Sequence, residues 1–476
     1  MRRFLAVGVA VFAVAAASAA AAAGPEVDVS NLKGAQAEVE IAADPTNPGI
    51  LLAASNSIDL QSISSLDDLM RTYSSADGGA TWTVGQGPSA TPYNGRKRCN
   101  GGDPAPAIDA SGHQYLAFLA TSCLTVAEAL NGDNEFDVAR LEVAVRANTA
   151  APWRVSQVFP VRSKRFDDKP GIAVDTAPAS PHFGRVYVTW TRITPPPKGS
   201  GVPQAVVAIS HSDDQGATWT KPVVVNDPGA AVWNTFANPA VDASGNVYVS
   251  WLTTTRQVKV DRSTDGGTTW GTDVLVGIAA GVPGDLDAQC QQPGSFGIPA
   301  QGNRCITAAP SIQVDSRPGV PERVYVVFSR PDGTGRAQDV VMHAFDAGLA
   351  SVGGEIRIHA ADLKRDEFLP ASAVDDAGRL WICFYDTGAD QTRRTTRFSC
   401  TATADGGATW ATPLAVASVA SNESKKPALP FQYGDYEGLV VAGGVAHPVW
   451  TDGRNVTTRG EEIYTRALTP ADLQLR

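Results

Sequence analysis

Charged residues gather in three short runs that stand just before apolar, strand-like segments of the chain. The runs are residues 165–169 (RFDDK), 365–368 (RDEF) and 433–437 (YGDYE). Two carboxyl groups in one poorly solvated pocket acquire different pKa values, so that one can donate a proton while the other accepts it. A tyrosine beside a carboxylate can serve as a nucleophile. These runs therefore indicate acid–base chemistry on a polar substrate, provided that the fold brings them together.

Arginines follow several later strand-like segments. They are Arg192, Arg256, Arg330 and Arg454. A guanidinium can hold a carboxylate or phosphate through two parallel hydrogen bonds, so these residues are candidates for binding an anionic group. Each of them alone also fits a salt bridge on the surface or between sheets. The acidic runs have alternatives too, because clustered oxygens suit a structural Ca²⁺ and the same residues form ordinary strand-end turns.

Other catalytic classes lack their motifs in this sequence. The six histidines are scattered without an H-E-x-x-H spacing, and no G-x-S-x-G elbow occurs. A zinc hydrolase and a serine hydrolase are therefore not favoured. The formal net charge of −10 at pH 7 disfavours a nucleic-acid partner.

An eight-residue pattern, S/T-x-D-x-G-x-T-W, occurs four times and indicates the kind of element that must position these residues. The copies are residues 75–82, 212–219, 263–270 and 403–410. Asp and Ser can bond nearby amides and close a turn, Gly provides a positive φ, and Thr and Trp begin the returning strand. The pattern therefore marks a structural turn between two strands.

A longer repeat surrounds these turns. A short apolar strand ends in Asp44, Asp109, Asp175, Asp242, Asp315 and Asp375, and a seventh copy near residues 439–442 lacks the Asp. Each copy leads into further short strands rich in Val, Tyr and Trp, and no long stretch has helical periodicity. Four strands per unit, repeated around an axis, predict an all-β β-propeller, with seven blades favoured and six as the alternative.

Closure of the predicted ring and the place of the site follow from this arrangement. The last unit has three strands, and residues 26–29 could supply its fourth, which would remove an exposed sheet edge. Segments that lead into the inner strands open on one face around the channel, whereas the Asp-containing turns lie near the rim of the other face. The run from Asp435 to Glu437 serves either this closure or the site.

The beginning of the chain and its cysteines indicate export. Residues 1–23 combine two arginines, an apolar run and small residues, which is typical of a signal peptide, so residues 24–476 are expected to form one propeller domain. An even number of cysteines in an exported chain favours disulfides. We expect neighbours in sequence to pair: Cys99 with Cys123, Cys290 with Cys305, and Cys383 with Cys400.

The four turns resemble the Asp-boxes, or BNR repeats, of the sialidase (neuraminidase) superfamily. The inner-strand repeat of residues 169–175, with residues 434–439 and 450–454, is similar to secreted bacterial Asp-box proteins described as sialidase-like. Such enzymes use three arginines, an acid/base Asp, and a Tyr nucleophile assisted by a Glu. The early Arg-Ile-Pro motif of the family is absent here, so the clamp arginines are assigned by position alone.

The resemblance implies a secreted, extracellular or periplasmic sialidase-like glycoside hydrolase that is exo-acting on acidic or polar glycans. The implied catalytic residues are Tyr436 as nucleophile, Asp168 as acid/base, and Glu437 or Glu367 as the partner of the tyrosine. The substrate-binding candidates are Arg165, Arg330, Arg454 and Asp435. The alternatives are a non-catalytic propeller that binds glycan or protein, and a scaffold whose channel holds Ca²⁺. We expect a monomer that needs no cofactor and does not insert into a membrane.

Overall fold

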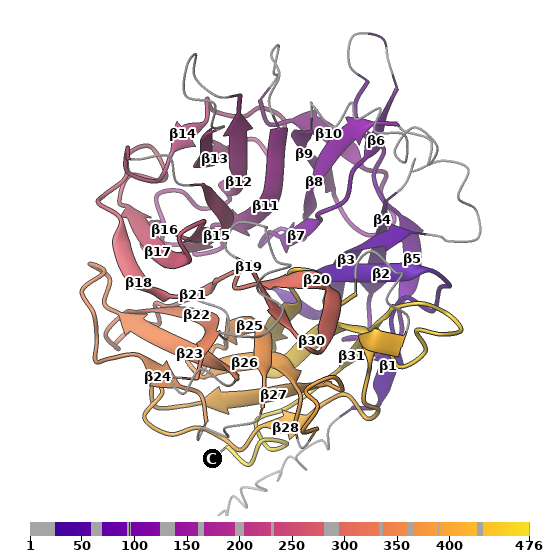
Figure 1. Cartoon of the computed structure of the whole chain (residues 1–476). Helices are drawn as coiled ribbons and strands as arrows, with labels where there is room; N and C mark the ends of the chain where they lie inside the picture. The colour runs from indigo at the N-terminus through magenta and orange to yellow at the C-terminus, as the bar shows by residue number, and fades with distance from the viewer. Residues whose placement is uncertain are drawn as a thin grey trace, which may run out of the picture.

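Seven antiparallel four-stranded sheets stand around one axis in the computed structural model of the protein (Figure 1). The structure describes residues 24–58, 69–92, 95, 97–123, 139–159, 166–195, 204–229, 233–279, 295–332, 337–359, 365–388, 390–425 and 432–475. The predicted all-β propeller is confirmed, and of the two blade counts seven is right. The expected signal peptide, residues 1–23, lies outside the described residues.

Each blade contributes one strand to each of four concentric positions, numbered outward from the axis. The inner strands are β2 (Ala35–Asp44), β7 (Ala105–Ile108), β11 (Phe166–Val174), β15 (Asn234–Val241), β21 (Ser311–Asp315), β25 (Glu367–Val374) and β29 (Gly438–Ala442). The second strands are β3 (Asn47–Ile58), β8 (Gln114–Ser122), β12 (Val186–Thr194), β16 (Val247–Thr253), β22 (Arg323–Pro331), β26 (Leu380–Asp386) and β30 (Val445–Asp452).

The outer half of each blade is completed by two further strands. The third strands are β4 (Met70–Ser75), β9 (Arg140–Arg146), β13 (Gln204–Ser212), β17 (Gln257–Ser263), β23 (Gln338–Phe345), β27 (Arg397–Thr403) and β31 (Glu462–Arg466). The fourth strands are β5 (Thr83–Gln86), β10 (Arg154–Gln157), β14 (Val223–Val224), β18 (Val274–Ile278), β24 (Ile356–Arg357), β28 (Leu414–Ala415) and β1 (Glu26–Asp28).

The ring closes as the sequence predicts. The amino-terminal strand β1 pairs antiparallel with β31, with Val27 opposite Thr465, and so completes blade 7. This pairing joins the two ends of the described chain in one sheet and leaves no open edge between the first and the last blade.

The second strands carry the largest buried side chains. Trp190, Trp251, Trp381 and Trp450 are fully buried, in the aromatic position that the repeat predicts. Each indole also donates a hydrogen bond to a nearby Asp or Asn oxygen; Trp190, for example, donates to Asp167 at 2.9 Å. Because a buried indole N–H needs an acceptor, this bond fixes the ring while its apolar body fills the space between blades.

Two kinds of Asp-containing turn shape the blades. At the end of β2, Asp44 accepts the backbone amides of Thr46 and Asn47, and Asp109 and Asp242 act in the same way in blades 2 and 4. Between the third and fourth strands, Asp214 accepts both the amide and the hydroxyl of Thr218, at 2.8 and 2.6 Å. Both kinds of Asp are bonded within their own turn, so they stabilise the fold.

Three elements lie outside the four-strand pattern. Strand β6 (Arg98–Asn100) pairs with β8, the hairpin of β19 (Ser295–Ile298) and β20 (Gln301–Thr307) stands apart from the blades, and η3 (Glu423–Lys425) is a short 3₁₀ turn. In Figure 1 the β19–β20 hairpin lies across the central part of the ring. Within the described part of the chain, no helix is long and apolar enough to span a membrane.

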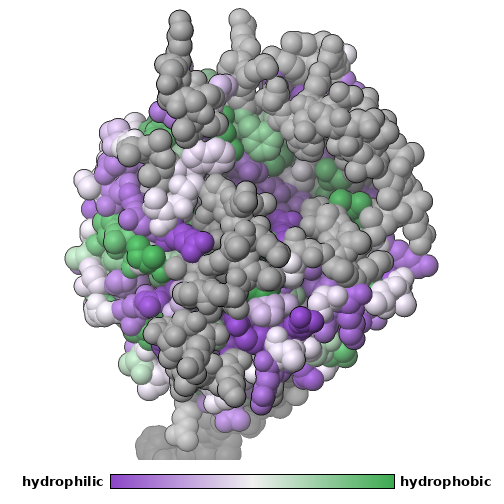
Figure 2. Space-filling view, in the orientation of Figure 1, coloured by the Kyte–Doolittle hydropathy of each residue, from purple (hydrophilic) through white to green (hydrophobic). Residues whose placement is uncertain are grey.

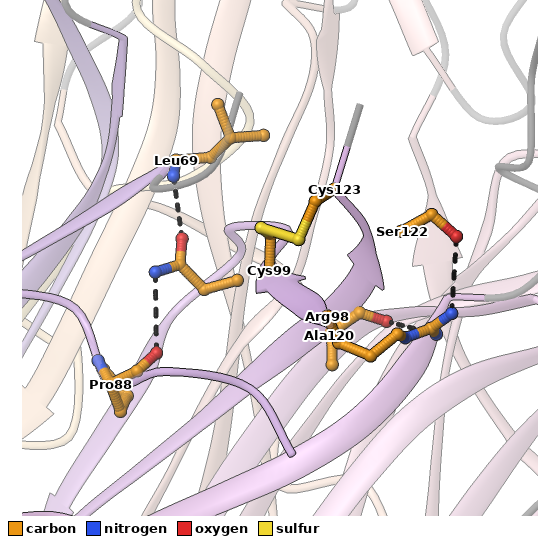
Figure 3. Close-up of a disulfide and its surroundings, with 8 residues drawn as sticks. Leu69, Pro88, Arg98, Cys99, Ala120, Ser122 and Cys123 are labelled. Atoms are coloured by element: carbon orange, nitrogen blue, oxygen red, sulfur yellow. Dashed lines mark hydrogen bonds between the residues drawn. A yellow bond between two sulfur atoms is a disulfide. The ribbon is translucent and has the colours of Figure 1, made fainter. Parts of the chain in front are cut away.

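Two of the three expected disulfides are confirmed. Cys99 of β6 pairs with Cys123 at the end of β8 and so holds the extra strand to blade 2 (Figure 3). Cys383 of β26 pairs with Cys400, its direct neighbour on β27. Cys305 is also disulfide-bonded, but its expected partner, Cys290, lies outside the described residues.

Candidate functional site

The inner strands bring polar residues to the axis through a repeated irregularity near their starts. The pairing of β2, β11 and β15 with their neighbours shifts at a bulge, where Glu38, Lys169 and Phe236 have φ values of 57°, 49° and 56°. Asp103, just before β7, has a φ of 52°. Such values are costly for residues other than glycine and tend to persist at functional sites. These residues all lie at or near the starts of inner strands, around the mouth of the channel. Figure 2 shows hydrophilic residues in a hollow near the centre of one face.

Lys169 is the centre of this mouth. Its Nζ lies 2.8 Å from Asp435 Oδ2, 3.2 Å from Asp103 Oδ2 and 3.6 Å from Glu38 Oε2. The three carboxyl groups come from blades 7, 2 and 1, so a single ammonium group joins parts of the chain that are more than 200 residues apart. The cation in turn requires these neighbours, because an unpaired buried charge is strongly unfavourable.

Arg304 adds a second cation from outside the blades. It lies on β20, and its guanidinium forms an ion pair with Glu38 and, at 2.8 Å, with Asp435. The hairpin is fixed further where Thr307 donates to the carbonyl of Asp435 and where Gln301 accepts the amide of Tyr433. The β19–β20 hairpin is therefore bound across the mouth by contacts with blades 1 and 7.

Charges within the cluster divide the carboxyl groups into two kinds. Burial is the largest single influence on the pKa of Asp103 and Asp435 and works to raise it. Lys169 outweighs burial together with hydrogen bonds from Glu38 and Asn56 at Asp103, and together with Arg304 at Asp435, so both pKa values lie below the usual range. Burial raises the pKa of Glu38 to about 8, against the opposing effect of Lys169 and Arg304. Asp103 and Asp435 are thus ionised at neutral pH, whereas burial biases Glu38 toward its protonated form against the two cations beside it.

Asn56 connects the two kinds of carboxyl group. Its amide nitrogen donates to Glu38 Oε2 at 2.7 Å, and its carbonyl oxygen accepts the backbone amide of Asp103, also at 2.7 Å. Gly102 must be glycine here, because its φ is 88° and a Cβ would lie 2.3 Å from the Asn56 carbonyl oxygen. The hydrogen bond between the Asp103 amide and the Asn56 side chain therefore sets how closely blade 2 approaches blade 1.

Of the predicted site residues, the structure brings Asp168, Asp435 and Tyr436 together. Burial raises the pKa of Asp168 to about 7, and Lys169 opposes the shift. Burial and the neighbouring Asp103 raise the pKa of the Tyr436 hydroxyl well above its usual value, and the Lys169 ammonium lies 5.7 Å from the centre of the Tyr436 ring. An acid poised near neutrality and a desolvated phenol thus share one environment.

The two glutamates predicted as partners of Tyr436 are bonded elsewhere. Glu437 accepts the Tyr385 hydroxyl at 2.6 Å and the amide of Thr451 at 3.1 Å, which joins blades 6 and 7. Glu367 forms an ion pair with His359 and accepts the amide of Val340. The carboxyl groups that influence Tyr436 are instead those of Asp103, Glu38, Glu40 and Asp435.

The predicted arginines do not join the cluster. Arg330 pairs with Glu355 within blade 5, and Arg454 pairs with Asp452 and Glu26 within blade 7, where it also stacks 4.0 Å from the Tyr464 ring. Each of the two guanidinium groups is thus paired within its own blade, which agrees with the alternative that these arginines form structural salt bridges. Arg165 lies outside the described residues.

Sequence reasoning missed Glu38, Asn56, Asp103 and Arg304 as site residues. One signal was available, because Asp103-Pro104-Ala105 has the same form as Lys169-Pro170-Gly171 and so marks an equivalent position in the repeat. Arg304 has no such signal, since its hairpin is not part of any repeat.

Below the cluster, the channel holds a cavity of about 330 Å³ that is lined by the inner-strand segments of all seven blades. Lys169, Phe236 and Tyr436 line it next to the mouth, and Glu40 and Asn238 line it two residues further along β2 and β15 than Glu38 and Phe236. The structure describes no group of three or more His, Cys, Asp or Glu side chains suited to a metal ion, and a structural Ca²⁺ stays a prediction.

Comparisons with known proteins give structural neighbours only. The sequence matches no protein-family model and no curated protein. A Dyadobacter fermentans protein of unknown function is similar at 15% identity and a TM-score of 0.47, over 76% of this chain and 93% of that one. An intramolecular trans-sialidase from Ruminococcus gnavus is similar at 11% and 0.47, over 94% and 96%. An ulvan lyase of a polysaccharide lyase family is similar at 11% and 0.49, over 94% and 99%.

Proposed function

We propose that the protein is a glycan-active propeller that cleaves a glycosidic bond at the mouth of its channel. The observation that carries this proposal is the meeting of Asp168 from blade 3 and Tyr436 from blade 7 around one buried ammonium group. An acid with a pKa of about 7 is half-protonated at neutral pH, which suits a group that must both donate and accept a proton.

In the proposed reaction Asp168 protonates the leaving oxygen of the glycosidic bond. The Tyr436 oxygen attacks the anomeric carbon and loses its proton to a neighbouring carboxylate, for which Asp103 has the largest electrostatic influence. A water molecule then attacks the anomeric carbon and breaks its bond to the Tyr436 oxygen, while Asp168 accepts a proton from that water molecule. Lys169 keeps Asp103 ionised and orients it.

The pairing of the cations limits the kinds of substrate that the site can bind. Lys169 and Arg304 are already paired with carboxylates, and Arg330 and Arg454 are paired within their own blades. Each of these four cations is therefore already engaged and does not present a free pair of N–H groups to a substrate carboxylate. We propose an exo-acting hydrolase for a polar, uncharged terminal sugar, in preference to sialic acid.

The test is release of a fluorophore from a panel of neutral, uronic and sialic acid glycosides. The native protein is expected to hydrolyse a neutral glycoside, and Asp168→Asn and Tyr436→Phe should each lower kcat by about 100-fold or more, the usual contribution of a positioned acid or nucleophile. Arg330→Ala is the control, because it removes a charge outside the cluster and should keep native activity. Hydrolysis that survives Asp168→Asn would exclude this mechanism.

A second function, binding without turnover, is favoured by the β19–β20 hairpin. Its contacts with Glu38 and Asp435 cover the mouth and neutralise the Arg304 charge. A glycan array would then show a bound glycan that the native protein does not cleave, and Asp168→Asn would bind it as well as the native protein does.

We further propose that the protein acts outside the cytoplasm. Its disulfides fit an oxidising compartment, where such bonds persist. Amino-terminal sequencing of the exported protein should show a start near residue 24, whereas a start at residue 1 would contradict the proposed signal peptide.

A further inference from the structure

The wall of the axial cavity is poor in hydrogen-bond donors. Five of its inner-strand segments carry a proline: Pro106, Pro170, Pro239, Pro310 and Pro370. The innermost strand of a blade presents its free edge to the axis, and a proline on that edge removes one backbone N–H while it keeps the carbonyl. The cavity therefore presents mainly acceptors to whatever enters it.

Glu40 supplies a carboxyl group to this wall. It lies on β2 and faces the cavity, and no described residue forms a hydrogen bond or ion pair with it. The other glutamate at the cavity, Glu437, has both oxygens occupied by Tyr385 and Thr451. Lys169 next to the mouth is held by Asp435 and Asp103. Of the two glutamates at the cavity, Glu40 is thus the one whose carboxyl group has no hydrogen-bond partner among the described residues.

The remaining polar side chains at the cavity also favour a donor-rich ligand. Gln313 donates its amide nitrogen to the Ser372 carbonyl at 2.8 Å, which leaves its carbonyl oxygen as an acceptor. The Asn238 side chain lines the cavity and has no hydrogen-bond partner among the described residues, so its carbonyl oxygen is a further acceptor beside its own N–H donors. A ligand with several N–H or O–H groups could therefore satisfy several acceptors at once.

The size and the aromatic lining of the cavity point to an organic cation and not to a metal ion. A volume of about 330 Å³ lies at the lower end for small-molecule pockets and far exceeds a bare ion. Phe236 and Tyr436 line it, and the Lys169 ammonium lies over both rings, 5.4 Å and 5.7 Å from their centres. Such rings attract ammonium groups.

We infer that the axial cavity binds a small organic ammonium ligand, of about the size of one amino sugar, with Glu40 as its counter-ion. This binding goes beyond the proposed cleavage at the mouth and does not depend on it. The ammonium group donates to Glu40, and its hydroxyl groups donate to the carbonyls of the proline-lined wall.

The experiment is calorimetric titration of the purified chain with D-glucosamine, and with D-glucose as the uncharged match. The native protein is expected to bind glucosamine at least about tenfold more tightly than glucose, the scale of one charge-assisted hydrogen bond. Glu40→Gln keeps the shape of the side chain but cannot ionise beside the ammonium group, so this variant should lose the preference, most clearly in titrations at about pH 8, where native Glu40 ionises. Equal affinities in the native protein, or a preference that survives in Glu40→Gln, would overturn the inference.

A second variant tests the inference in case Glu40→Gln does not fold. Asn238→Asp adds a carboxylate to the same wall and should strengthen glucosamine binding severalfold while it leaves glucose binding unchanged. Titration with CaCl₂ alone is the remaining arm. Calcium binding that requires Glu40 and excludes glucosamine would replace the ammonium site with a metal site.

Discussion

Asp168 and Glu40 at the axis differ in their electrostatic properties from the aspartates in the turns at the rim, and also from Asp103 and Asp435, which Lys169 helps to keep ionised. At the rim, the hydrogen bonds from Thr218 lower the pKa of Asp214 to about 2. At the axis, burial raises the pKa of Asp168 to about 7 and that of Glu40 to about 8. The same residue types thus serve as fixed structural anions on one face and as titratable groups on the other.

This difference predicts opposite effects of pH on stability. A lowered pKa adds stability above the unfolded value, and this stability is lost as the pH falls through the folded pKa. A raised pKa adds stability below the unfolded value, and this stability is lost as the pH rises through the folded pKa. The rim turns should therefore weaken below about pH 4, whereas Asp168 and Glu40 at the axis weaken the fold between about pH 4 and pH 8.

The largest effect is expected for Lys169→Met. The substitution keeps the length of the side chain but leaves Asp103 and Asp435 buried together with one cation fewer, so we expect a loss of about 3–5 kcal/mol in the free energy of unfolding. Denaturant unfolding at neutral pH measures it. Lys259→Met is the matched control, because Lys259 pairs with Asp273 away from the axis, and such a partly exposed pair contributes about 1 kcal/mol or less. Equal losses in the two variants would contradict a special role for the axis.

A smaller effect, with a pH signature, is expected for Glu40→Gln. Near pH 4.5 the native Glu40 is protonated in the folded state, so the variant should match the native protein. As the pH rises, the unfolded chain loses this proton near 4.5 and the folded chain only near 8, so the native protein becomes less stable. Because the side chain is only half-buried, we expect the variant to be more stable by roughly 2 kcal/mol at about pH 8. Thermal unfolding across this pH range measures the difference, and a constant difference would show that Glu40 does not titrate.

The two regions also differ in how far the sequence could predict them. The hydrogen bonds of Ser212 and Asp214 that close their rim turn join residues within one eight-residue pattern, so local spacing was enough to place the turn and, through its repetition, the blades. The pairing of Cys383 with Cys400 followed in the same way, because both lie on neighbouring strands of one predicted unit.

The mouth depends instead on how the ring closes. Lys169 of blade 3 meets Asp435 only after blades 4, 5 and 6 have been added and blade 7 begins, and no local pattern states which side chains will converge there. Asp168, Asp435 and Tyr436 could be placed because they start inner strands. Glu437 could not, because it directly precedes β29 and no local pattern shows that its carboxyl group accepts the hydroxyl of Tyr385 from blade 6.

The smallest effect is expected at the rim, for Asp214→Ala. The substitution removes the acceptor of both the amide and the hydroxyl of Thr218, which are exposed and can bond to water instead. We therefore expect a loss of about 1 kcal/mol at neutral pH, close to the net value of an intramolecular hydrogen bond. The loss should shrink as the pH falls toward about 2, where the native Asp214 is itself protonated. Denaturant unfolding of both proteins at neutral and acidic pH measures this. A loss that grows with acidity would mean that the rim carboxylates behave like those at the axis.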